Sequence, residues 1–161
     1  MDDALERLGA VLDWAALWGM ELDTRFRVLA ATFEPSLERY PWGESDDRRV
    51  QVLFFPVSTI LASLRRLDED EPALVTFDVA HLVDVVAAFD GATVPPPLLG
   101  RPEPKPGEWG PRFSLEGRST TADGTRNTLT VQLRTEDLEL DLFARFDDAE
   151  VKDPAGEELP L

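Results

Sequence analysis

The chain has 161 residues, 43% of them hydrophobic, which is enough to form one domain with a buried core. Its 32 acidic residues against 16 Lys and Arg give a formal net charge of −16, and a surface of that sign repels nucleic acid and anionic lipid. The lack of cysteine excludes disulfides, thiolate metal sites and cysteine nucleophiles.

Apolar residues recur at helical spacing near the N-terminus and predict a helix over residues 3–18. In such a helix Trp14 and Trp18 lie one turn apart and form an aromatic ridge. We expect the ridge to pack in the core, with Trp18 largely buried. The alternative is that Trp14 and Trp18 join two copies of the chain, or bind a partner. Alternating residues then predict a strand over residues 24–33.

The middle of the chain is predicted to hold three strands and a second helix. Residues 49–55 and 58–66 form strands separated at Pro56, because proline cannot donate a hydrogen bond within a sheet. A short strand at 73–77 precedes a helix at 79–90. The apolar positions of that helix share one face, and they are Val79, Leu82, Val83, Val86 and Phe89.

The last third gives the clearest pattern. Residues 92–111 carry seven prolines and predict an internal loop without regular structure. Residues 112–120 and 126–134 alternate on either side of Asp123-Gly124, which predicts a hairpin. Residues 138–146 add a third antiparallel strand beside them.

The order of elements predicts a single acidic α+β domain over residues 1–161. We expect an antiparallel sheet of about six to seven strands with two helices packed on one face. A β-sandwich closed by helices is the alternative. Residues 147–161 are polar and are expected to form a flexible tail.

Catalytic signatures are missing from the sequence. It holds no phosphate-binding glycine loop, no nucleophile elbow and no paired histidines, so no catalytic residues, metal ligands or cofactors are predicted. The lone histidine, His81, lies on the polar side of its helix with Asp84 and is expected to be exposed and dispensable. An enzymatic role is therefore disfavoured but left open.

One loop has the composition of a ligand site. Aromatic and basic side chains between residues 39 and 49 are suited to line a pocket for a flat or anionic ligand, unless the aromatics fold back over the sheet. Trp109 invites the same two interpretations. The candidate ligand-binding residues are Tyr40, Trp42, Arg48, Arg49 and Trp109.

Charge gives the leading hypothesis of function. Residues 136–161 hold ten acidic and two basic residues, and such clustering can steer a cationic partner. We expect a non-catalytic regulatory or interaction module that binds a more basic protein, with Glu136, Glu139 and Asp141 as partner-binding residues. The alternatives are a small-molecule-binding protein or enzyme using the 39–49 loop, and a structural homodimer. The acidic N-terminus and the shortness of every apolar run predict a cytoplasmic protein without a secretory signal or membrane span.

Overall fold

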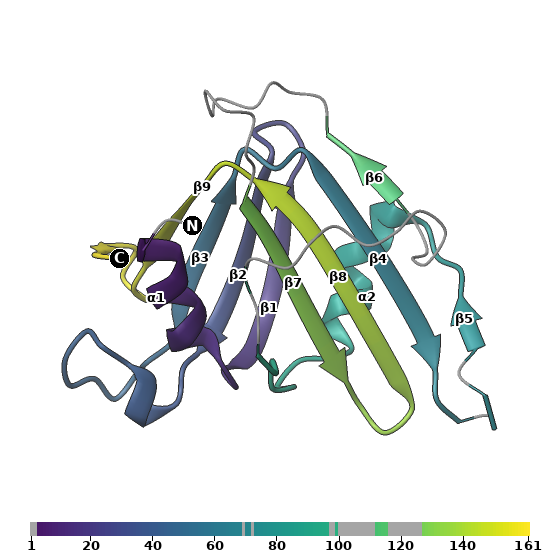
Figure 1. Cartoon of the computed structure of the whole chain (residues 1–161), viewed down its shortest axis with the longest axis horizontal. Helices are drawn as coiled ribbons and strands as arrows, with labels where there is room; N and C mark the ends of the chain where they lie inside the picture. The colour runs from purple at the N-terminus through teal and green to yellow at the C-terminus, as the bar shows by residue number, and fades with distance from the viewer. Residues whose placement is uncertain (1–2, 69, 72, 97–98, 100–111, 116–126) are drawn as a thin grey trace.

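The computed structural model describes the whole chain apart from residues 1–2, 69, 72, 97–98, 100–111 and 116–126 (Figure 1). The described residues form two helices, two short 3-10 helices and ten strands. In chain order these are α1 (Asp3–Leu12), β1 (Ala16–Asp23), β2 (Val28–Glu34), η1 (Leu37–Arg39), β3 (Val50–Phe55), β4 (Thr59–Arg66), β5 (Ala73–Val75), η2 (Val79–His81), α2 (Leu82–Ala87), β6 (Arg112–Ser114), β7 (Asn127–Arg134), β8 (Leu138–Phe146), β9 (Asp148–Lys152) and β10 (Glu158–Leu159).

The strands form two antiparallel sheets instead of the single sheet that the sequence predicts. The first has the order β1-β2-β3-β9-β10, and we call it sheet A. The second, sheet B, has the order β5-β4-β8-β7, with β6 paired to β4. The fold is therefore α+β in the broad sense, but its core lies between two sheets.

Two pairs of successive strands run from one sheet into the other. β3 continues into β4, β8 continues into β9, and the two long strands pair with each other along their length. Between the pairs Phe55–Asp148 and Thr59–Arg145, three residues of one strand face two of the other. This extra residue is a bulge, and bulges bend a strand pair. The predicted break at Pro56 lies at this corner, and the Phe55–Pro56 peptide is cis.

Residues 91–96 and Leu99 contact the free edges of the two sheets. Thr93 forms a bridge with Ala16 at the edge of β1, and Leu99 forms one with Leu129 in β7. The backbone N–H of Trp14 donates to the carbonyl of Val94 at 2.7 Å, which fixes the start of this segment. The seam between β1 and β7 is thus crossed by backbone that belongs to neither sheet.

Helix α2 is shorter than the predicted helix but uses the same apolar face. Leu82, Val86 and Phe89 are buried in the core that the two sheets share, whereas Val83 is 37% exposed. The helix contacts β1 and extends the layer of sheet A, so that Figure 1 shows it behind β4 and β8. Helix α1 buries Leu5, Leu8 and Leu12 at one end of the same core.

The predicted helix over residues 3–18 is wrong beyond Leu12. Trp14 has a left-handed backbone with φ +61°, which ends the helix, and Ala16–Asp23 form β1. Leu17 is buried, so its neighbour Trp18 points outward and is 47% exposed instead of buried. The register shift between Leu17 and Gly19 then returns Met20 to the core. The helical spacing of the tryptophans is coincidental, because Leu17 and Met20 supply the core contacts here.

The predicted strand at 24–33 is also displaced. Residues 24–27 form the turn of the β1–β2 hairpin, and Phe26 at its tip is 64% exposed. The carboxylate of Asp23 accepts the backbone N–H groups of Arg25 and Phe26 at 2.9 and 3.0 Å. A side-chain oxygen that binds backbone two and three residues ahead stabilises a turn, so the local chemistry overrides the alternation.

In the last third the hairpin of β7 and β8 is confirmed, but the partner of the preceding strand is not. Arg112–Ser114 pairs with β4, on the opposite side of sheet B from β7. The predicted turn at Asp123-Gly124 and most of the Pro-rich loop lie outside the described residues. The expected tail at 147–161 instead contains β9, which pairs with β3 and buries Ala149 and Val151.

Candidate interaction face

The aromatic residues of the 39–49 loop pack against the core, and Trp42 also borders a hollow of about 440 Å³ between this loop, α1 and the C-terminal segment. Tyr40 and Trp42 meet edge to face with ring centroids 5.4 Å apart, and both pack against the core. The indole N–H of Trp42 donates to the carbonyl of Pro160 at 2.8 Å. Trp42 thereby ties this loop to the C-terminal segment beside α1.

The arginines of the same loop lie elsewhere and are already paired. Arg48 lies 3.6 Å from the carboxylate of Glu34. Arg49 holds Asp47 through two hydrogen bonds of 2.9 and 2.6 Å, and these lower the pKa of Asp47 to about 2. Trp42 and Arg49 border different hollows, so the structure does not bring the predicted set together. Trp109 lies outside the described residues.

Two of the three predicted partner-binding carboxylates form an internal cluster. Arg65 contacts Asp141 at 2.6 Å and Glu139 at 3.5 Å across β4 and β8. Their side chains are only 16% and 20% exposed, and the guanidinium offsets part of their charge. Glu136 alone is fully at the surface, in the β7–β8 turn.

The outer face of sheet A presents apolar side chains in the middle of the sheet. Because side chains alternate along a strand, the residues between the core positions of β2 and β3 point away from the core. They include Val28, Ala30, Leu53 and Phe55, which we call the apolar strip. Ala30 is 8% exposed, and the other three are partly exposed.

Carboxylates border the apolar strip on both sides. Glu21 pairs in register with Ala30, Ala30 with Leu53, and Leu53 with Glu150, so one row across four strands reads acid, apolar, apolar, acid. In the next row Asp23 lies opposite Val28, and Phe55 lies opposite Asp148. Among the described residues, none of these four carboxylates takes part in an ion pair.

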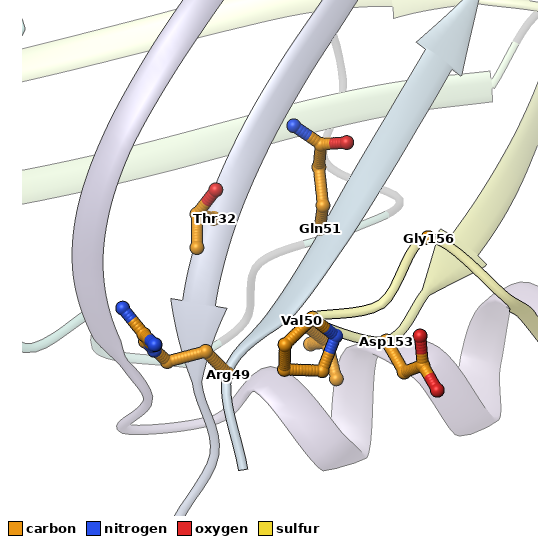
Figure 2. A pocket seen from close by; sticks show the side chains of 7 residues that line it. Thr32, Arg49, Val50, Gln51, Asp153 and Gly156 are labelled. Atoms are coloured by element: carbon orange, nitrogen blue, oxygen red, sulfur yellow. The ribbon is translucent and has the colours of Figure 1, made fainter. Parts of the chain in front are cut away.

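Beyond this row the same face continues into a polar hollow of about 280 Å³. Figure 2 shows Thr32 and Gln51 on neighbouring strands, with Arg49 and Asp153 on either side. Lys152 pairs in register with Gln51 and adds a positive charge at this end. The outer face of sheet A therefore has two parts. At one end the apolar strip lies between two acidic edges, and at the other end the face is polar.

The candidate catalytic and metal-binding side chains include His81 and the carboxylates of Asp and Glu. His81 is exposed, as predicted from its helical phase. No group of three or more His, Asp or Glu side chains in the described part of the chain is arranged to hold a metal ion. The described helices are all too short or too polar to cross a membrane.

Comparison with protein-family models, with curated proteins and with solved structures finds no match to this chain.

Sequence reasoning missed the outer face of sheet A because its residues come from four strands that are far apart in the chain. One signal was present. The stretch from Val52 to Val57 is apolar without interruption, whereas a strand with one wet face normally alternates. Such a run indicates that both faces of β3 carry apolar side chains.

Proposed function

We propose that this protein is a non-catalytic interaction module that binds a basic segment of another protein on the outer face of sheet A. The observation that carries the proposal is the row Glu21–Ala30–Leu53–Glu150. In it two apolar residues lie between two carboxylates that form no ion pair with any residue in the described ranges. The proposal keeps the class of partner expected from the net charge. It moves the site away from Glu139 and Asp141, whose charges Arg65 already offsets.

The spacing of the face suits an amphipathic helix. Neighbouring strands lie about 4.8 Å apart, so the two flanks of the row are separated by roughly 14 Å. A helix with its side chains is about 10–12 Å across, which fits between them. Its apolar stripe would contact the apolar strip, and Lys or Arg on each side would meet the carboxylates. The strip is small, so complementary charge is expected to contribute mainly to the rate of encounter.

The homodimer alternative has less support. Leu5, Leu8 and Leu12 of α1 are buried in the protein's own core, and Trp14 and Trp18 lie beyond the end of that helix instead of forming a ridge on it. Two copies that met through the outer face of sheet A would bring like charges together, which is unfavourable.

The test uses two variants of equal charge. The face variant carries Glu21→Gln, Asp148→Asn and Glu150→Gln. The control variant carries Glu38→Gln, Glu44→Gln and Glu136→Gln, three exposed carboxylates away from that face. Wild type and both variants are used in parallel to capture proteins from a lysate of the source organism. We expect at least one protein to be captured by wild type and by the control variant but not by the face variant.

Association kinetics with that purified partner then test the mechanism. The face variant should associate at least about tenfold more slowly at low salt, and the difference should shrink as salt rises, because exposed charges are screened beyond roughly 8 Å at physiological ionic strength. Leu53→Ala should mainly speed dissociation. If the face variant and the control variant bind alike, or if no protein distinguishes them, the proposal is wrong.

A further inference from the structure

A second hollow, separate from the proposed partner face, lies at the seam between the two sheets. It has a volume of about 300 Å³, which is in the range of small-molecule sites. Trp14, Thr93 and Pro95 border it from the β1 side, and Gln132, Arg134 and Glu139 from β7 and β8. We call it the seam pocket.

Trp14 enters this pocket from a backbone position that is unfavourable for a bulky residue. Its φ of +61° lies in the left-handed region, where glycine or asparagine usually follows the end of a helix. Trp14 is nevertheless 55% exposed, so core packing does not account for the placement of its indole. Strained residues of this kind concentrate at ligand sites. The indole provides an aromatic wall beside Pro95.

The other wall offers one positive and one negative group side by side. Arg134 and Glu139 pair in register across β7 and β8, but no ion pair joins them. Glu139 uses Oε1 to accept from Arg65, whose closer contact is with Asp141. Arg134 forms no ion pair with any described residue, so its guanidinium can bind an anion. Gln132 adds an amide that can donate and accept.

We propose that the seam pocket binds a free α-amino acid with an apolar or aromatic side chain. Arg134 binds the carboxylate, for which the fork of a guanidinium is well suited. Glu139 accepts hydrogen bonds from the ammonium group. The side chain of the ligand packs on Trp14 and Pro95. An anion bound by Arg134 would also lie near the carboxylate of Glu139, and a cation bound by Glu139 would lie near the guanidinium of Arg134. A zwitterion places an opposite charge on each group, which is the reason for choosing it.

Isothermal titration with four probes tests the head group. The probes are L-phenylalanine, L-leucine, N-acetyl-L-phenylalanine, which lacks the ammonium group, and L-phenylalaninamide, which lacks the carboxylate. We expect the two amino acids to bind and both derivatives to bind about tenfold more weakly or worse, since a hydrogen bond to a charged group accounts for about that factor. Equal affinity for L-phenylalanine and its derivatives would overturn the proposal. The proposal would also be overturned if neither L-phenylalanine nor L-leucine bound at 10 mM, which is roughly the highest Kd expected for such a ligand.

Variants test the residues. Arg134→Gln should weaken L-phenylalanine about tenfold or more while leaving the affinity for L-phenylalaninamide unchanged, because the amide has no carboxylate to lose. Arg25→Gln, an exposed arginine at the β1–β2 turn, is the matched control. Trp14→Leu should weaken both probes, and Trp18→Leu neither. Thermal unfolding of each variant verifies that it is folded. If Arg134→Gln lowers the affinity for both probes equally, or for neither, the assigned role of Arg134 is refuted.

Discussion

Replacing Phe146 by alanine tests whether the core lies where the two sheets meet. Phe146 is fully buried at the end of β8, next to the bulge through which this strand continues into β9. Its ring meets that of Phe54 on β3, with centroids 4.9 Å apart and an interplanar angle of 63°. The pair lies at the corner where the chain changes sheet, so its loss should weaken both sheets together.

The magnitude follows from the burial. Truncating a fully buried Phe to Ala typically costs about 3–5 kcal/mol, from lost transfer free energy and the remaining cavity. In a domain of this size each 1 kcal/mol lowers Tm by about 2–4 °C, so we expect a decrease of roughly 6–20 °C. Urea unfolding should give a lower midpoint with an unchanged slope, because the area exposed on unfolding stays nearly the same.

Phe26→Ala is the matched control, since Phe26 is 64% exposed at the tip of the β1–β2 hairpin. It should change the free energy of unfolding by less than about 1 kcal/mol. If Phe146→Ala and Phe26→Ala unfold at the same midpoint, the packing at the corner is not as described.

Two further predictions concern ion pairs. Arg65→Met should lower the free energy of unfolding, measured in urea, by about 1–3 kcal/mol, because it leaves the partly buried carboxylates of Asp141 and Glu139 without their cation. Arg66→Met is the control and should change that free energy little, because the side chain of Arg66 is 53% exposed. Asp47 should titrate in the folded protein at a pKa of about 2, below its ordinary value of 3.8, chiefly because of its hydrogen bond with Arg49. This pair therefore favours the folded state above the ordinary pKa and ceases to do so as pH falls through about 2. NMR titration of the carboxyl carbon measures the pKa, and Arg49→Gln should bring it back toward the ordinary value.

Local chemistry explains which parts of the fold were predictable. Pro56 interrupts an apolar run and divides β3 from β4, because a proline cannot donate within a ladder. The alternation of residues 138–146 gave β8 and its hairpin with β7. In contrast, the periodicity of the first helix continued by chance through Trp14 and Trp18, and only the left-handed backbone of Trp14 ends it. That conformation is disfavoured for tryptophan, so no local rule predicts it.

The candidate sites were less predictable than the fold. Glu21, Ala30, Leu53 and Glu150 form one row only because four strands pair in a particular register, and that register depends on contacts between distant residues. Similarly, Arg65 lies more than seventy positions from the carboxylates that it binds. Composition indicated an acidic surface, but it did not distinguish carboxylates that are paired from those that are free.

The two continuous strands also constrain when this protein can fold. The ladder between residues 50–66 and 138–152 joins segments roughly 70–100 residues apart, and contacts at such separation form slowly because the intervening chain must first be closed into a loop. A nascent chain that ends before β8 lacks both β8, the neighbour of β4 in sheet B, and β9, the neighbour of β3 in sheet A. The domain therefore cannot be divided into halves that fold one after the other during synthesis. The strongly acidic composition opposes aggregation before β8 and β9 have been synthesised. Like charges repel unfinished chains from one another while their apolar strands are still exposed.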